Sequence, residues 1–229
     1  MTKTALITGA SRGLGLALAR ALAVRGWQLI INARGATALE AARAELALYT
    51  TVTAIAGDVS DPEHVHNLAS AAANGLDLVV NNAGILGPSP QPELRDYPLH
   101  LLLDVYCINV IAPLSILQAV YTVLRPNAAI INVTSDAAIE AYPGWGGYGS
   151  SKMALEQLSA VFSAENSHLR TYWVDPGDMR TAMHQAAFPD TDISDRDLPE
   201  ASIPGLIKLI FGNLPSGRYK AKSIGNDSI

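Results

Sequence analysis

Thr8-Gly9-Ala10-Ser11-Arg12-Gly13-Leu14-Gly15 separates a short apolar run, Ala5 to Thr8, from an Ala- and Leu-rich stretch, Leu14 to Arg25. Glycines in such a segment let the backbone turn tightly, approach a phosphate closely and pack the next helix on the preceding strand. The start of a helix also offers unpaired N–H groups to an anion. The segment therefore predicts a strand, a phosphate-binding turn and a helix. The alternative is a plain strand-to-helix turn, against which the three glycines argue.

Apolar runs of strand length alternate with helical stretches along the rest of the chain. The further expected strands are 28–32, 51–56, 76–81, 128–133, 169–174 and an edge strand at 217–220. The expected helices are 14–25, 36–48, one that opens at Asp61-Pro62-Glu63, 99–124, 146–166 and 202–211, and the segment 178–199 is polar, acidic and irregular. This alternation predicts an α/β fold, a Rossmann-type doubly wound parallel sheet of about seven strands with helices on both faces. No linker or repeat divides the chain, so we expect one domain over residues 1–229.

The composition restricts the class of protein. Hydrophobic residues make up 49% and charged residues 16% of the 229 residues, which indicates a globular protein with a large core. The net charge of −5 without a Lys/Arg-rich run argues against nucleic-acid or anionic-membrane binding. Cys107 is the one cysteine, so no intrachain disulfide can form. The chain enters a strand at once, and no uninterrupted apolar stretch reaches membrane-spanning length, so we expect a cytoplasmic protein.

The unusual residues follow the expected strands. In open parallel sheets, ligands bind at the carboxyl ends of the strands. The residues at these ends are Gly9, Asp58, Asn81 to Gly84, Ser135, and Pro176 with Gly177. Their convergence predicts one binding site at this edge of the sheet.

The second strand is followed by Asn32-Ala33-Arg34-Gly35. Dinucleotide-binding folds usually place an acidic residue near this point to hold the adenosine ribose hydroxyls. An arginine suits a 2′-phosphate instead, through its charge and its fork of N–H groups, and Arg12 could reach the same phosphate. We therefore expect NADPH rather than NADH. The alternative is that both arginines are simply solvated.

Tyr148 and Lys152 stand four residues apart in a predicted helix, and Ser135 precedes Tyr148 by thirteen residues. Four residues is about one helical turn, so the two side chains share a face. An ammonium beside a phenol favours the phenolate and makes the phenol a usable acid or base near neutral pH. Ser135 could hold the oxygen on which that acid acts. The alternative for the pair alone is a solvated surface pair.

Together these motifs resemble the short-chain dehydrogenase/reductase family, from Thr8 to about Arg218. The resemblance rests on residues that occur in the family's order and spacing: Thr8 to Gly15, Asn81 to Gly84, Asn109, Ser135, Tyr148 with Lys152, and Pro176-Gly177 followed by Thr181. It implies an oxidoreductase that transfers a hydride between a nicotinamide cofactor and a carbonyl or alcohol. No cluster of histidines suggests a metal site, and His64 and His66 are expected on an exposed helix.

The resemblance also implies roles. Tyr148 would donate a proton to the substrate oxygen, Lys152 would lower the Tyr148 pKa and hold the nicotinamide ribose, and Ser135 would position the carbonyl. Asn109 would keep a water that links Lys152 to solvent. The expected cofactor-binding residues are Gly9, Ser11, Arg12, Gly13, Leu14, Gly15, Arg34, Asp58, Val59, Asn81, Asn82, Ala83, Gly84, Tyr148, Lys152, Pro176, Gly177, Met179 and Thr181.

Aromatic and apolar residues predominate in the segments that would line the substrate site. The expected substrate residues are Ser135, Glu140, Tyr142, Trp145 and Met183, with Ile139, His184 and Phe188 nearby. They suggest a moderately apolar or aromatic carbonyl compound. Asp136 and Asp178 depart from the family's pattern and could meet a basic or hydroxyl-bearing substrate, or point to solvent or cap a helix. The acidic stretch 190–197 could be a mobile lid or a disordered loop.

Other functions stay open at this point. A nucleotide-sensing or scaffolding relative would keep the fold without catalysis, although such proteins typically lose the Tyr or the Lys. A nucleotide-sugar epimerase or dehydratase usually has a different glycine spacing and a longer C-terminal substrate domain. By analogy with the family, we expect a homodimer or homotetramer packed through the two long helices that hold Asn109 and Tyr148.

Overall fold

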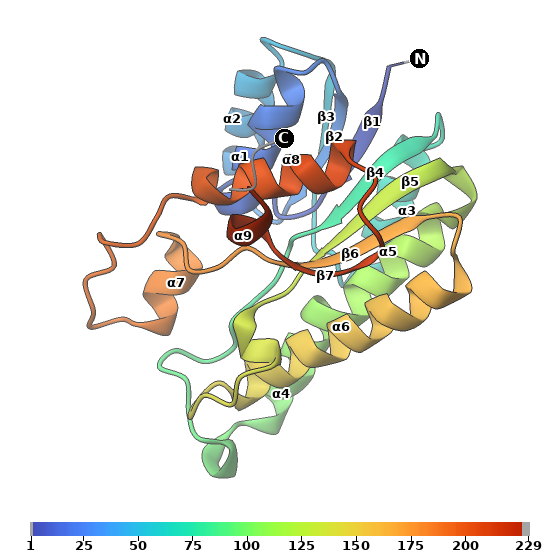
Figure 1. The fold of residues 1–229 in the computed structure, drawn as a ribbon. Helices are drawn as coiled ribbons and strands as arrows, with labels where there is room; N and C mark the ends of the chain where they lie inside the picture. The colour runs from blue at the N-terminus through green and yellow to red at the C-terminus, as the bar shows by residue number, and fades with distance from the viewer. Residues whose placement is uncertain (1, 226–229) are drawn as a thin grey trace.

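A seven-stranded parallel sheet forms the centre of the computed structural model, which describes residues 2–225 (Figure 1). Its strands lie in the order β3-β2-β1-β4-β5-β6-β7, and every neighbouring pair is parallel. Their bounds are β1 Thr4–Ile7, β2 Gln28–Ala33, β3 Val52–Ala56, β4 Leu76–Asn81, β5 Leu124–Val133, β6 Arg170–Asp175 and β7 Gly217–Lys220. The chain moves outward in one direction from β1 and in the other from β4. The predicted doubly wound fold of about seven strands is confirmed.

Helices cover both faces of this sheet (Figure 1). Helices α1 (Gly13–Ala23), α2 (Ala36–Leu46) and α8 (Ile203–Phe211) pack on one face. Helices α3 (Pro62–Ala71), α5 (Ala112–Val120) and α6 (Gly146–Glu165) pack on the other. The remaining short elements are α4 Leu99–Tyr106, η1 Leu94–Asp96, η2 Cys107–Ile111, η3 Tyr121–Val123, η4 Asp136–Ala138, η5 Pro199–Ser202, α7 Ala182–Ala187 and α9 Ala221–Gly225.

The apolar strand sequences follow from burial on both faces. Ala5 and Ile7 of β1 belong to the core under α1, α2 and α8, whereas Leu6 belongs to the core under α3 and α5. Successive side chains of a strand point to opposite faces, so most positions of a strand covered on both sides are shielded from water and favour apolar residues. The central strands therefore appear in the sequence as largely apolar runs, and the asparagines within them, Asn32, Asn81 and Asn132, are buried.

The connection between β4 and β5 differs most from its expected bounds. It is helical from 99 to 123, but Cys107–Ile111 form a π-helical turn, and β5 already begins at Leu124. Leu124 pairs with Leu76, the register then shifts, and Asn127 has a φ of 61°. This irregular start hides the first residues of β5 from a search for uninterrupted apolar runs. The other strand and helix ends lie within a residue or two of the expected positions.

The span 99–123 also has the length and composition of a membrane-crossing helix, with a mean hydropathy of 1.7. It contains His100, Asp104 and Asn109, which interrupt the apolar run. Its buried side chains include Val105 and Ile116, and it contacts both α3 and α6. A helix that covers a core sheet meets the same criteria of length and composition.

Two local predictions need correction. The segment 178–199 is not irregular throughout, because it contains helix α7 (Ala182–Ala187), whose N-terminus is capped by the Thr181 hydroxyl. His64 is not exposed: it is buried, and its Nε2 lies 2.7 Å from Asn32 Nδ2. The missing side chain of Gly57 leaves the room for its ring, since a Cβ there would lie 2.2 Å from His64 Nδ1.

We predict that His64→Gln reduces the pH dependence of folding. Burial lowers the pKa of His64, against the weaker effects of Asp61 and Asp58. The folded protein keeps this ring neutral, whereas the unfolded chain takes up a proton below its ordinary pKa of 6.5. The contribution of the buried His64 to the free energy of unfolding is thus present above a pH of 6.5 and is lost as the pH falls below that value. Urea unfolding between about pH 7.5 and about pH 5 should show a smaller loss of stability for H64Q than for wild type.

His66→Gln is the matched control, because His66 lies on the exposed side of the same helix. It should retain the wild-type pH dependence. Parallel stability curves for wild type and H64Q would contradict the prediction.

Candidate active site

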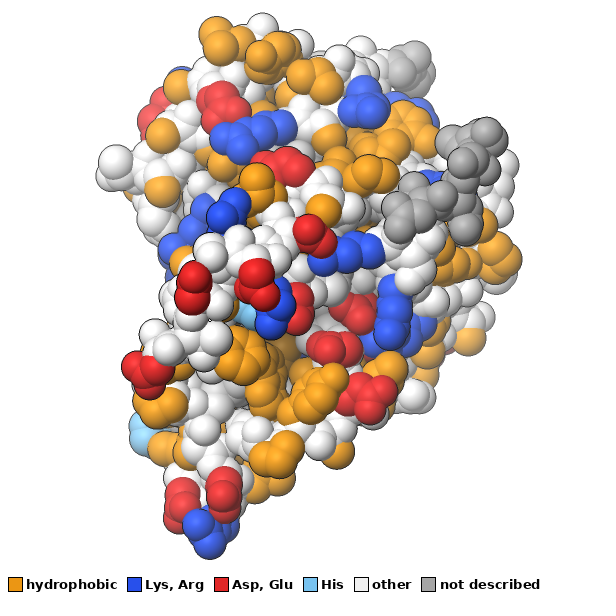
Figure 2. All heavy atoms as spheres, turned by 60° about the vertical axis from the view of Figure 1, so that its left-hand side comes forward, with side chains coloured by type: hydrophobic (Ala, Val, Ile, Leu, Met, Phe, Trp, Pro, Cys, Tyr) orange, Lys and Arg blue, Asp and Glu red, His pale blue; other side chains and the backbone are white. Residues whose placement is uncertain are grey.

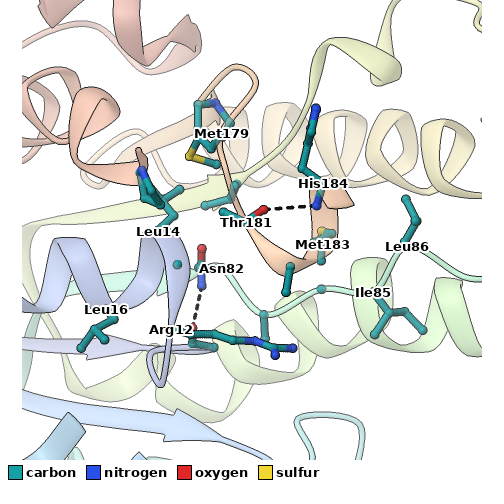
Figure 3. Close-up of a pocket in the computed structure, with 18 of the residues that line it drawn as sticks. Arg12, Leu14, Leu16, Asn82, Ile85, Leu86, Met179, Thr181, Met183 and His184 are labelled. Atoms are coloured by element: carbon teal, nitrogen blue, oxygen red, sulfur yellow. Dashed lines mark hydrogen bonds between the residues drawn. The ribbon is translucent and has the colours of Figure 1, made fainter. Parts of the chain in front are cut away.

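A cavity of about 800 Å³ lies at the carboxyl ends of the strands, and Figure 3 shows part of its lining. The turn after β1, the loop after β4, the end of β5, helix α6 and the segment after β6 all contribute to it. Figure 2 shows this side of the molecule, where both acidic and basic side chains lie around an apolar hollow. The expected residues in the lining are Gly9, Ser11, Arg12, Gly13, Leu14, Arg34, Asp58, Val59, Asn82, Ala83, Gly84, Ser135, Trp145, Tyr148, Lys152, Pro176, Gly177, Met179, Thr181 and Met183.

The glycines of the turn after β1 are required for different physical reasons. Gly9 and Gly13 have φ values of +66° and +58°, where a side chain is strained. A Cβ at Gly15 would lie 2.5 Å from the Gly9 carbonyl oxygen. Asn82 crosses from β4 and donates from its side chain to the carbonyls of Thr8 (2.9 Å) and Gly9 (3.1 Å). The turn is therefore held in shape by the neighbouring strand.

Helix α1 begins directly behind this turn. Arg12 occupies its N-cap position without a side-chain cap hydrogen bond, and its first turn contains no acidic residue. The first N–H groups of the helix and its dipole therefore favour an anion. The large cavity volume, the close backbone approach at Gly9 and this helix start together fit a dinucleotide with its pyrophosphate at α1.

Basic side chains line the cavity at the end of β2. Arg34 is exposed over 65% of its side chain, and its Nη1 lies 4.0 Å from Asp58 Oδ2. Arg12 lines the same cavity, as Figure 3 shows. Burial raises the pKa of Asp58, but hydrogen bonds from Ser60 and the charge of Arg34 outweigh it and lower that pKa overall. The Arg34 guanidinium thus has one long ionic contact and remains accessible to a ligand.

Helix α6 brings Tyr148 and Lys152 together at the opposite end of the cavity. Both side chains are buried, and the Lys152 Nζ lies 5.6 Å from the centroid of the Tyr148 ring. Lys152 also donates to the Val133 carbonyl of β5 at 2.8 Å. Ser135 follows β5, and its hydroxyl donates to Asp136 Oδ1 at 2.9 Å. The three predicted catalytic groups at this end therefore meet in one cavity.

The ionisation of this pair differs from the expectation. Burial raises the pKa of Tyr148; a hydrogen bond with Ser135 opposes this, while the charges of Asp136 and Asp175 add to it. Burial also lowers the pKa of Lys152 to about 8. The expected lowering of the Tyr148 pKa is thus absent from this structure. The reason is that desolvation of the phenol outweighs the hydrogen bond with Ser135, and the charges of Asp136 and Asp175 act in the same direction as desolvation.

Asn109 occupies a different position from the reacting groups. It lies in the π-helical turn, fully buried, where its Oδ1 accepts from the Ile85 N–H and its Nδ2 donates to the Ile85 carbonyl and to Ser151 Oγ. These bonds join the loop after β4 to α6. Like Gly15 and Asn81, it supports the cavity from behind instead of lining it. A role for it in proton return stays a prediction.

The substrate end contains part of the expected set. Trp145 contacts Tyr148 edge to face at 5.8 Å and also meets Phe188 at 5.8 Å. Glu140 and Tyr142 do not line the cavity: both are exposed, and the Tyr142 hydroxyl donates to Asp136 at 3.2 Å. Sequence reasoning missed the cavity-lining residues Arg20, Ile85, Leu86, Leu198 and Glu200. No motif marks them, because they reach the cavity only through the fold.

The two unusual aspartates have partners inside the protein. Asp136 accepts the bonds from Ser135 and Tyr142 described above. Asp178 lies 3.7 Å from Arg196, and Lys222 bridges the Asp178 carbonyl and the Asp197 carboxylate at 2.9 Å each. These bonds fix both ends of the segment 178–199. Within residues 2–225, no group of His, Cys, Asp or Glu has the arrangement of a metal site.

Comparison with known proteins agrees with this geometry. The profile of the short chain dehydrogenase family matches residues 3–192. The chain is 32% identical over 184 residues to a serine 3-dehydrogenase of Agrobacterium fabrum. The matched region covers 77% of this chain and 72% of that protein. It is 33% identical over 214 residues to the 3-oxoacyl-(acyl-carrier-protein) reductase of rhamnolipid biosynthesis from Pseudomonas aeruginosa, covering 88% and 82%. A solved short-chain dehydrogenase from Shigella flexneri, complexed with NADP, has a TM-score of 0.89 and 27% identity, covering 96% of this chain and 97% of that one.

We predict that Lys152→Met stabilises the fold near neutral pH. Lowering the pKa from 10.5 to about 8 means that the buried ammonium costs on the order of 3 kcal/mol below pH 8. Losing the bond to the Val133 carbonyl offsets part of the gain, so we expect a net increase of about 1–2 kcal/mol. At about pH 9.5 the folded lysine is neutral and the cost has fallen to roughly 1.5 kcal/mol, which the lost bond to Val133 offsets, so the net gain should nearly vanish. Urea unfolding at the two pH values measures this.

Lys3→Met, at an exposed lysine, is the control and should give no such gain. A K152M protein that is less stable than wild type at about pH 7, or whose gain is the same at both pH values, would sink the prediction.

Proposed function

This chain belongs to the short-chain dehydrogenase/reductase family, whose members are oxidoreductases that bind a nicotinamide cofactor and act on alcohol or carbonyl compounds, and we propose that it is an NADPH-dependent reductase of a small-molecule ketone or aldehyde. One observation carries the proposal: Tyr148, Lys152 and Ser135 converge in the cavity whose other end is the glycine turn. The bound nicotinamide supplies the hydride.

The side chains at the substrate end suit the charge that develops during reduction. Hydride addition to a carbonyl leaves an alkoxide, which requires hydrogen-bond donors and a proton. In the proposed reaction, Ser135 orients the oxygen and Tyr148 gives it the phenolic proton. Burial raises the pKa of Tyr148, so the phenol holds that proton at neutral pH until the alkoxide forms. Lys152 holds the ribose and supplies positive charge beside the phenol.

Two arginines support NADPH as the cofactor. Arg34 follows β2, where a carboxylate would select the ribose hydroxyls of NADH, and Arg12 lines the same part of the cavity. A guanidinium matches a phosphate in both charge and geometry. The NADP complex of the Shigella flexneri protein supports the same choice. A catalytically silent binding protein would be favoured by the loss of Tyr148 or Lys152, and both are present.

The proposed substrate is a moderately apolar or aromatic carbonyl compound, bound against Trp145 and Met183. We also propose a cytoplasmic homodimer or homotetramer. Exposed apolar side chains on the two long helices support the oligomer: Leu103 and Ile111 on the span 99–123, and Met153 and Val161 on α6.

Tyr148→Phe tests the chemistry. Removing the proton donor should lower kcat by about a hundredfold or more, because a positioned acid contributes at least that factor. The Kd of NADPH should change by less than about threefold. Loss of NADPH absorbance across a panel of ketones and aldehydes measures turnover. Tyr121→Phe, whose hydroxyl bonds to Asn166 instead of the cavity, is the control and should keep wild-type activity. Full activity of Y148F would overturn the mechanism.

Arg34→Ala tests the choice of cofactor. The loss of a charge-assisted bond to the 2′-phosphate should raise the KM for NADPH by about 10- to 100-fold and leave the KM for NADH almost unchanged. Arg43→Ala removes a partly exposed arginine of α2 that pairs with Glu40 and serves as the control. An equal effect of R34A on both cofactors would show that Arg34 does not select the phosphate.

A further inference from the structure

Arg218 links the edge of the sheet to the catalytic end of the cavity. It lies on β7, opposite Trp173 of β6. Its Nε donates to Glu156 Oε1 at 3.0 Å and Oε2 at 3.2 Å, and its Nη2 donates to the Ser135 carbonyl oxygen at 3.1 Å. The same Nη2 lies 3.9 Å from Asp175 Oδ2. One guanidinium therefore contacts three segments that build the candidate active site.

The contacts of Glu156 show which parts of the candidate active site Arg218 holds in place. Tyr148, Lys152 and Glu156 follow one another at intervals of four residues on α6, so they share a helix face. Glu156 is 7% exposed and also accepts a bond from the Thr134 hydroxyl at 2.8 Å. Thr134 and Ser135 are the residues that directly follow β5. Arg218 and Glu156 thus fix the helix that carries Tyr148 to the backbone that carries Ser135.

Burial makes the loss of these contacts costly in stability. Asp175, at the end of β6, is 4% exposed, and burial raises its pKa overall, while the hydrogen bond from the Gly177 N–H and the charge of Arg218 oppose that rise. Buried carboxylates without a cationic partner are strongly destabilised. Arginine can serve two carboxylates and a carbonyl at once because its N–H groups point in fixed, different directions, which a lysine cannot do.

We infer that Arg218 is a positioning residue for the reduction, which sets the Ser135 backbone and helix α6 so that the Ser135 hydroxyl and the Tyr148 phenol address the same substrate oxygen. The inference rests on the proposed function. Arg218 itself does not line the cavity. Its effect is therefore expected in kcat, through the alignment of Ser135 and Tyr148, and not in the affinity for the nucleotide at the other end.

Arg218→Met tests the inference. A misalignment of the reacting groups by about an ångström costs on the order of a hundredfold in rate, so kcat should fall by about that factor while the Kd of NADPH stays within about threefold. Arg218→Lys keeps the charge but not the fork, and should recover only part of kcat. It also provides the measurement if R218M does not fold.

Arg170→Met is the matched control. Arg170, on neighbouring β6, donates to the carbonyls of Asn127, Leu209, Ile210 and Gly212, and so ties the sheet to the end of α8 away from the cavity. R170M should lower the midpoint of thermal unfolding and retain kcat. If R218M keeps kcat within about threefold of wild type, or if R170M loses as much kcat at equal thermal stability, the inference is wrong.

Glu156→Gln and the double variant R218M/E156Q add a second readout. Residues that act as one unit lose their effect together, so the double variant should lose no more kcat than R218M alone. If the two substitutions together reduced kcat by the product of their separate factors, a shared role of Arg218 and Glu156 would be contradicted.

Failure of the proposed function has its own signature, since wild type would then turn over no carbonyl compound. In that case crystal structures of wild type and R218M decide the inference. Displacement of Ser135 relative to Tyr148 in R218M supports it, and an unmoved Ser135 overturns it.

Discussion

The close approach of the loop after β4 to the turn after β1 is the constraint on which the rest of the structure depends. The Asn82 side chain bonds to the Thr8 and Gly9 carbonyls, and the Thr8 hydroxyl accepts from the Asn82 and Ala83 N–H groups at 3.0 Å each. A side chain at Gly9 would meet Asn82 Nδ2 at 2.8 Å. The two loops meet at the point where the winding of the sheet reverses, and both of them line the cavity.

The catalytic end of the cavity depends on polar groups held in a poorly solvated environment. Lys152, Glu156 and Asp175 are all buried, and each has a defined partner: the Val133 carbonyl for Lys152, and Arg218 for the two acids. Such an arrangement costs stability, because charged groups lose their hydration. It also raises the pKa of Tyr148 and lowers that of Lys152, so the two effects of burial act on the groups proposed to move the proton. Stability and reactivity are thus set by the same desolvation.

Local sequence signals could predict the parts of this structure that depend on local physics. The strand bounds of β4 and β7 agree with the expected 76–81 and 217–220, and the Asp61 cap and Pro62 open α3 as expected. Backbone conformation and hydrophobic periodicity decide these features within a few residues. Residues whose position depends on contacts between segments far apart in the sequence are not marked by a local sequence pattern. His64 can be buried because Gly57 leaves space for its ring, and the start of β5 is hidden by the turn at Asn127.

The same distinction explains which site residues could be predicted. Gly9, Ser135, Tyr148 and Lys152 belong to short motifs in which each residue has a chemical reason for its place. Arg218 reaches Glu156 across 62 residues and Ser135 across 83, and its own surroundings in the sequence are unremarkable. Its importance follows from topology: β7 pairs with β6, and β6 pairs with β5, so a long side chain on the edge strand can extend to the residues after β5. A chain in which the last strand completes the sheet can therefore use that strand to support a site built by the earlier ones.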